Sequence, residues 1–226
     1  YVQFKDAVGN WSQSYSTVIL LDTVLPTGSM NYQMLPATGQ TKCYDASGSI
    51  ISCTGTGQNG ANPDGQAWPN PRFVNPDGTA PVSGDVVVDK LTGLIWAKDG
   101  STPGFGACTG GYKSWNLALS YIACLNANNY LGYSDWRMPN IAEVLSLVNW
   151  GQANSATWLN GQGFSGVTGS YWTSTTLAPP SSNVKWYVDL NTNLANATDK
   201  SNTQPVLIVR EAVSDLLGVP FVQLLR

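Results

Sequence analysis

The sequence predicts an α+β fold, in which two helices are followed by a mostly antiparallel set of short strands. Apolar residues recur at helical spacing in two stretches, residues 114–125 and 140–148. After Gly151 the chain has short apolar runs typical of strands, separated by loops rich in Gly, Asn and Ser. Because the strands follow the helices instead of alternating with them, a parallel sheet is not expected.

Composition places the chain among globular proteins with uncharged polar surfaces. Hydrophobic residues make up 42% of the 226 residues, whereas charged residues make up only 11%. This balance is typical of extracellular, loop-rich proteins. A net charge of −3 provides no basic surface for nucleic acid. No run of about 18 apolar residues is present, so no membrane span is expected.

The first 27 residues predict a β-hairpin, with strands at residues 1–4 and 16–22. The sequence "YVQFKDAVGNWS", followed by "ILLDTVLPTG", resembles the closing hairpin of bacterial immunoglobulin-like repeats. Such sandwiches need about seven strands, and this segment provides two. We therefore expect the chain to be a piece of a longer protein.

Residues 28–70 predict an extended connector, because Gly, Pro, Ser, Thr and Asn dominate them. Cys43 and Cys53 bracket a polar turn in this segment, and Cys108 and Cys124 form a second local pair. An even number of cysteines in a weakly charged chain favours the disulfides 43–53 and 108–124, and an oxidising compartment. A zinc site is disfavoured, because the chain has no His and neither pair has zinc-knuckle spacing.

A compact domain is expected over residues 71–212. Strands are predicted at residues 86–89 and 94–97, and later at residues 169–175, 184–190 and 205–210. Ser114 is the expected cap of the first helix, whose apolar stripe is Trp115, Ala118, Leu119, Ile122 and Leu125. Asn140 and Glu143 have capping-box spacing at the start of the second helix, whose stripe is Ile141, Val144, Leu145 and Val148.

Two short motifs in this domain have a structural interpretation. Asp135 and Arg137 flank Trp136, so that a carboxylate–guanidinium pair between them would hold the turn before the second helix. Tyr171 and Trp172 stand among small hydroxyl residues, which is typical of a strand with one buried face.

The order of several motifs is specific to one family. The chain contains "DKLTGLIWAKD", "YLGYSDWRMPNIAEVLSLV", "YWTSTT", "VKWYVDLNTN" and "VLIVR" in this order. The series, over residues 35–212, resembles the Lcl C-terminal domain family. The resemblance implies a C-type-lectin-like fold, related to that of formylglycine-generating enzymes. It also implies a secreted or cell-surface protein, since the family is named for a bacterial adhesin that recognises sulfated glycans.

A ligand site is expected in the polar segment 179–203. Amide and hydroxyl groups beside an exposed aromatic ring are what a sugar-binding face requires, and this segment also contains Lys200 and Asn202. The alternative is a solvated loop rich in turn-forming residues. The predicted ligand-binding residues are Trp186, Tyr187, Asn183, Asn191, Asn193, Asn196 and Asp199. No metal ion or cofactor is expected, and the Glu-Pro-Asn and Gln-Pro-Asp signatures of calcium-dependent lectins are absent.

These observations favour a non-enzymatic binding or adhesion module of an extracellular or bacterial cell-surface protein, with a glycan or protein ligand. The chain lacks His, the commonest general base. The first alternative is a structural subunit of an extracellular fibre or surface assembly. It would associate through both termini, since the tail at residues 213–226 is strongly apolar. The second alternative is a formylglycine-generating-like enzyme, which would need a free thiol.

Overall fold

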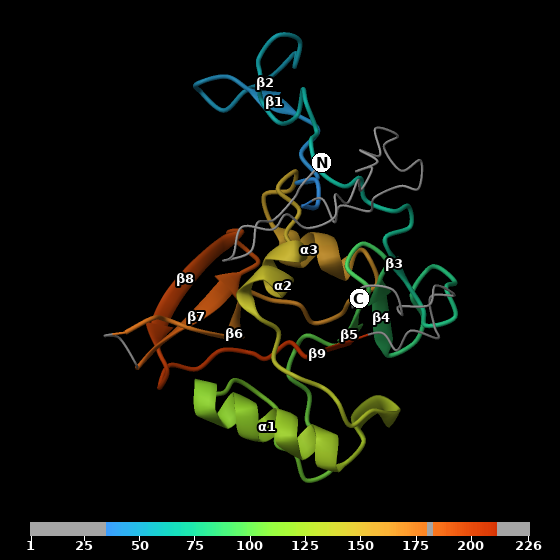
Figure 1. The fold of residues 1–226 in the computed structure, drawn as a ribbon, viewed down its shortest axis with the longest axis vertical. Helices are drawn as coiled ribbons and strands as arrows, with labels where there is room; N and C mark the ends of the chain where they lie inside the picture. Colours follow the sequence, from blue (N-terminus) through green and yellow to red (C-terminus); the bar gives the residue numbers. More distant parts are fainter. Residues whose placement is uncertain (1–34, 180–182, 212–226) are drawn as a thin grey trace, which may run out of the picture. The chain divides into compact units, whose positions relative to one another are not determined.

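The computed structural model describes residues 35–179 and 183–211 (Figure 1). The chain divides into two units, residues 1–34 and residues 35–226, and all described residues belong to the second unit. The immunoglobulin-like hairpin predicted for residues 1–27 and the apolar tail at residues 213–226 lie outside the described residues.

The described residues form a mixed α+β structure in which each sheet is antiparallel. One sheet has the strand order β3-β4-β5-β9, a second has the order β6-β7-β8, and β1 and β2 form a small hairpin. The strands are β1 (Cys43–Tyr44), β2 (Ile50–Ile51), β3 (Phe73–Val74), β4 (Val86–Asp89), β5 (Leu94–Ala97), β6 (Ser170–Thr176), β7 (Val184–Asp189), β8 (Leu194–Asp199) and β9 (Val209–Glu211). The helices are α1 (Trp115–Ala127), α2 (Ile141–Ser146) and α3 (Ser155–Asn160), with a 3-10 turn η1 (Tyr130–Gly132).

Both predicted helices are confirmed. The capping box of α2 is complete, since the Asn140 side chain accepts from the Glu143 N–H and the Glu143 carboxylate accepts from the Asn140 N–H. In α1 the prediction that Leu119 belongs to the buried stripe is wrong. Leu119 is 40% exposed, whereas Tyr121, which was not in the predicted stripe, is buried on the inner face. The inner face of α1 is therefore rotated from the predicted stripe.

A third helix, α3, was not predicted. It has six residues, less than two turns, so the sequence offers too short a window for a 3.6-residue period to be visible. Its start does carry a signal, because the Asn154 side chain accepts from the Thr157 N–H as an N-cap.

The two larger sheets lie between two apolar cores. Helices α2 and α3 cover one side and α1 covers the other (Figure 1). Val87 of β4 faces the α2–α3 core, whereas its neighbours Val86 and Val88 face the α1 core. Tyr171 and Trp172 likewise enter opposite cores and are both fully buried, so the prediction that their strand has one buried face is wrong. The reason is that helices cover both faces of this sheet.

The last strand is shorter than predicted. Residues 206–209 are buried, but only Val209–Glu211 pair along β5. Before that point the backbone is held by isolated hydrogen bonds. Val206 N–H donates to the Thr102 hydroxyl, and Ala97 N–H donates to the Ile208 carbonyl. Of the predicted strand at 205–210, residues 205–208 are therefore extended chain outside the strand ladder.

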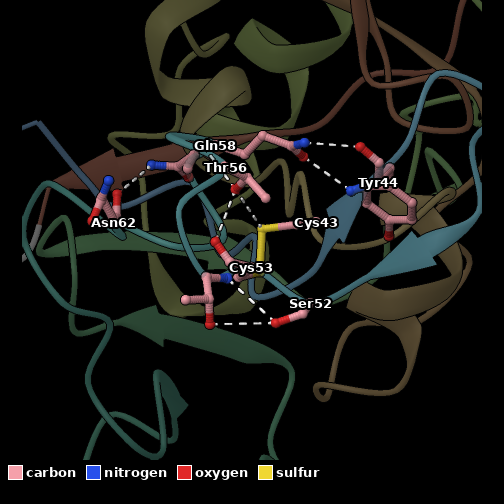
Figure 2. The surroundings of a disulfide bond; sticks show 9 residues. Cys43, Tyr44, Ser52, Cys53, Thr56, Gln58 and Asn62 are labelled. Carbon is pink, nitrogen blue, oxygen red and sulfur yellow. Dashed lines mark hydrogen bonds between the residues drawn. A yellow bond between two sulfur atoms is a disulfide. The ribbon is translucent and has the colours of Figure 1, made fainter.

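The described part of the predicted connector is folded. Both predicted disulfides form, Cys43–Cys53 and Cys108–Cys124, so all four cysteines of the chain are paired. Figure 2 shows the first disulfide beside Gln58, whose side-chain amide donates to the Tyr44 carbonyl and accepts from the Tyr44 N–H. The predicted disulfide and this amide bridge both close the loop of the connector.

The segment also rests on the main domain. The Trp68 ring lies 5.4 Å from the Trp158 ring of α3, measured between ring centroids. The Trp150 N–H donates to the Thr38 carbonyl. Residues 35–70 are thus anchored to the domain at both ends of the stapled loop.

Candidate functional site

The turn before α2 is held by two hydrogen-bonded ion pairs, neither of which is the predicted one, and the Glu211 carboxylate lies 3.7 Å from the Arg137 guanidinium. The prediction that Asp135 pairs with Arg137 is wrong. Asp135 accepts from Arg210 at 2.7 and 3.0 Å, and Arg137 donates to Glu143 at 2.8 and 2.7 Å. The backbones of Arg137 and Val209 exchange hydrogen bonds, which brings Arg210 beside the turn. Sequence spacing could not show that approach, because it joins segments about 70 residues apart along the chain.

Both carboxylates of this turn have lowered pKa values. Hydrogen bonds from the Arg210 guanidinium lower the pKa of Asp135 below its usual range. Burial raises the pKa of Glu143, but the bonds from Arg137 and the Asn140 N–H outweigh burial and lower it. Both groups are ionised at neutral pH, as structural ion pairs require.

A third ion pair is fully buried. Arg72 donates from Nε and Nη2 to the Asp89 carboxylate at 2.8 and 2.7 Å, and from Nη2 to the Ser146 carbonyl. Its guanidinium also lies 4.6 and 4.7 Å from the centroids of the Trp68 and Phe73 rings. Arg72 therefore joins β4, α2 and the stapled segment. These charges hold the fold together.

The predicted ligand-binding segment forms the β7–β8 hairpin instead of a loop. The two strands pair in unbroken register from Val184↔Asp199 to Asp189↔Leu194. Strand β8 was not predicted, because its sequence LANATD consists mostly of Ala, Asn and Asp, which are depleted in strands, and Thr198 is its single β-branched residue.

The hairpin divides the predicted residues between its two faces. Trp186 lies opposite Ala197, on the same face as Val188, which enters the α2–α3 core. Tyr187 lies opposite Asn196 on the other face, where its ring packs against Trp172 at a centroid distance of 6.4 Å. Trp186 and Tyr187, both half-buried, therefore do not belong to one site.

Two of the predicted asparagines serve the turn between the strands. Asn193 is buried with a φ of 61°, and its side chain donates to the Gln152 carbonyl and accepts from the Ser155 N–H. The Asn191 side chain accepts from the Asn154 side chain, next to the start of α3. These amides attach the turn to α3, and Asn193, which is only 7% exposed, has little surface to offer a ligand.

The remaining predicted polar residues lie on the surface. Asn183, Asn196, Asp199 and Asn202 are exposed, and Lys200 is half-buried. Asp199 accepts from the Ser201 N–H, and this bond and others in the turn lower its pKa. Trp186 lies opposite Ala197, and Asp199 lies further along the same face of the hairpin.

Two features near α1 were not predicted. Lys185 is only 9% exposed, and its Nζ lies 4.8 Å from the centroid of the Trp115 ring, so it packs inward as a cation over an aromatic face. A shallow, open cleft of about 390 Å³ lies beside the second disulfide. It is lined by Ala107, Cys108, Thr109, Lys113, Leu117, Ser120, Tyr121 and Cys124. Leu117 is apolar but lies outside the predicted apolar stripe of this helix, and it is 59% exposed. An apolar residue at that position was the signal in the sequence for this cleft.

The buried phenols of the domain are structural groups. Burial raises the pKa of Tyr171 to about 12, and its hydroxyl donates to the Gly100 carbonyl. Burial also raises the pKa of Tyr121, whose hydroxyl donates to the Pro103 carbonyl. Both phenols stay neutral near pH 7. Over residues 35–179 and 183–211 no cluster of acidic or Cys side chains is suited to hold a metal ion.

Comparison with known families decides the affiliation. Residues 85–210 match the model of the Lcl C-terminal domain, which is more than half of the chain. The chain belongs to the Lcl C-terminal domain family. The matched region of this Lcl C-terminal domain begins just before β4 and ends at Arg210. It includes all three helices, the β7–β8 hairpin and the Asp135–Arg210 pair, and it leaves out the stapled segment. A search of curated proteins finds no significant match to the chain.

Two further findings bear on where the domain resides. The two disulfides are characteristic of proteins that fold outside the reducing cytoplasm. Among the described residues, no helix combines the length and apolar character needed to cross a membrane.

Proposed function

We propose that this Lcl C-terminal domain is a non-enzymatic binding module of an extracellular or cell-surface protein, with a C-type-lectin-like fold and a glycan ligand. The observation that carries the proposal is the face of the β7–β8 hairpin that carries Trp186. There the half-buried Trp186 lies opposite the small Ala197, and the exposed Asp199, which pairs with Val184, lies on the same face; Asn183 is exposed at the open end of the hairpin, one residue before β7.

This face has the chemistry that a sugar needs. The flat indole ring matches the apolar face of a pyranose, and Ala197 leaves its approach open. Amide and carboxylate groups provide donors and acceptors for sugar hydroxyls. The Asn183 side chain makes no hydrogen bond within the described residues, so it enters a complex without losing one. A binding site needs groups of this kind, free of structural duties.

The rest of the domain supports binding over catalysis. All four cysteines are in disulfides, so the thiolate that a formylglycine-generating-like reaction requires has no source here. The described ion pairs join segments of the fold, and the buried phenols are neutral. A location outside the cell agrees with the disulfides and the low charge content.

A glycan array followed by calorimetry tests the proposal. The domain is expected to bind a subset of neutral or weakly charged glycans, and Trp186→Ala is expected to abolish detectable binding. Asn183→Ala is expected to weaken it several-fold, by about the worth of one hydrogen bond. The matched control is Trp150→Ala, since Trp150 is 48% exposed but lies outside the hairpin, in the turn after α2.

Two results would overturn the proposal. One is a glycan whose binding is lost in Trp150→Ala and kept in Trp186→Ala. The other is an array without any specific ligand for a protein whose disulfides have been verified by mass spectrometry under non-reducing conditions.

A further inference from the structure

Strand β8 is an open sheet edge. Among residues 35–179 and 183–211 it pairs with β7 along one side only, because the order in its sheet is β6-β7-β8. Leu194, at one end, is 53% exposed, and Asn196 and Ala197 in the middle are also exposed. Such an edge presents unpaired backbone donors and acceptors to any strand that approaches it.

The outward backbone groups can be identified from a neighbouring bond. Lys200 N–H donates to the Asn183 carbonyl, so residue 200 points its backbone groups to the neighbouring strand. Because bonding directions alternate along an antiparallel strand, residues 194, 196 and 198 also point their backbone groups to β7. Those of Ala195 and Ala197 therefore point away from the sheet. In the part of the chain that the structure describes, neither residue donates its N–H to another loop or strand.

The edge lacks the usual protection against pairing. Proteins commonly guard an open edge with charges, proline or a bulge. β8 contains no proline, its single charged residue is Asp199 at the last position of the strand, and the register with β7 is continuous. By contrast, β6, at the other edge of the same sheet, has an irregular register between Trp172 and Thr176, and its Ser174 N–H donates to the Pro139 carbonyl.

We infer that β8 is a self-association edge, where a second copy of this chain adds its own β8 in antiparallel orientation about Ala197. In this register Ala197 lies opposite Ala197 of the second copy, and two hydrogen bonds join them. Asn196 lies opposite Thr198, so that an amide meets a hydroxyl. Asp199 lies opposite Ala195, so no two like charges oppose each other. The strand is self-complementary, and this favours a second copy over an unrelated peptide as its occupant.

The pairing would have a consequence for binding. A two-fold axis perpendicular to the sheet leaves each face on its own side, so both Trp186 rings would lie on one side of a continuous six-stranded sheet. Two ligand faces on one side bind a repeating surface ligand with higher avidity than one face does. This consequence rests on the proposed function, whereas the self-association itself does not.

A charge-swap pair tests the inference by sedimentation velocity over a concentration series. Wild-type protein is expected to dimerise, and Ala197→Lys and Ala197→Asp are each expected to weaken dimerisation by about tenfold, since like charges then meet across the axis. An equimolar mixture of the two variants is expected to regain dimers, because the introduced ammonium of one copy meets the introduced carboxylate of the other. Thr192→Lys is the matched control: it adds the same charge in the exposed turn and is expected to dimerise as wild type does.

Ala197→Pro gives a second, independent readout. The Ala197 N–H points outward, so proline removes no bond within the chain but removes both central bonds between copies. Near-UV circular dichroism of each variant verifies the fold. A wild-type protein that stays monomeric at millimolar concentration would overturn the inference, as would a dimer that survives Ala197→Pro or a mixture of the two charge variants that remains monomeric. Glycan binding is measured on wild-type protein and on Thr192→Lys instead of the Ala197 variants, because Ala197 lies opposite Trp186 on the proposed ligand face, and this keeps the two results separate.

Discussion

The turn before α2 and the β7–β8 hairpin are both polar, but they use their polar groups in opposite ways. In the turn, Asp135 and Arg137 bind partners on β9 and α2, and the side chains fix the backbone of three segments. On the hairpin, Asn183 and Asn196 lie on the surface, whereas the buried Asn193 is committed to the fold. The comparison teaches that the charged groups of the turn are committed to ion pairs within the fold, whereas the hairpin keeps some of its amides, those of Asn183 and Asn196, exposed on the surface.

The largest expected effect concerns the buried ion pair between Arg72 and Asp89, whose charges join segments of the fold as those of the turn do. Asp89→Ala leaves the Arg72 guanidinium buried without a counter-charge, and removes the acceptor for Leu91 N–H and the Thr92 hydroxyl. The free energy of unfolding is expected to fall by about 3–5 kcal/mol in urea titrations. The matched control, Asp199→Ala on the exposed hairpin, is expected to leave the urea midpoint unchanged. A similar loss in both variants would break the distinction between structural charges and the free hairpin surface.

A smaller effect is expected within the hairpin itself. Asn193→Ala removes two buried hydrogen bonds to the segment around α3, so the free energy of unfolding is expected to fall by about 1–3 kcal/mol. Asn196→Ala changes a side chain on the surface and is expected to alter stability by less than about 0.5 kcal/mol. Thermal unfolding of the two variants measures the difference. Equal stability losses would show that the hairpin's amides are structural throughout.

The pH dependence of stability is expected to be slight until the solution becomes acidic. The pKa of Asp135 is lowered from 3.8, so the unfolded chain binds more protons than the folded one between the two values. Its contribution is therefore present above about pH 4 and is lost as the pH falls through the lowered pKa. Because the Asp135 side chain is 56% exposed, water screens the pair and the effect is small.

The same measurement on Asp135→Asn isolates this pair. Its stability is expected to decline less than that of wild type below about pH 4, and both curves should be flat from about pH 6 to 8, because the chain has no His. A steep change in wild-type stability near neutral pH would contradict this picture.

Local signals predicted local structure well. The Asn140–Glu143 spacing, the apolar runs at 86–89 and 94–97, and the cysteine pairs each depend on residues close in sequence, and the structure has all of them. The motif order also predicted the family, which the match to residues 85–210 confirms.

What the sequence could not predict depends on distant contacts. The true partners of Asp135 and Arg137 follow from the pairing of residue 137 with Val209, which no spacing rule contains. Strand β8 has little intrinsic strand propensity, and it forms because each of its residues pairs with a residue of β7. By contrast, the alternation of side chains along a strand predicts that Trp186 and Tyr187 lie on opposite faces of the sheet, and the register of β7 confirms it.

The central claim is that the face of the β7–β8 hairpin around Trp186 is the binding surface. It is tested most directly by titrating isotope-labelled protein with the best glycan from the array and following side-chain N–H signals by NMR. We predict that the Trp186 indole and the Asn183 side-chain amide shift in a saturable way, while the exposed Trp150 indole stays in place. Shifts centred on Trp150, or on the cleft beside the Cys108–Cys124 disulfide, with the hairpin signals unchanged, would contradict the claim.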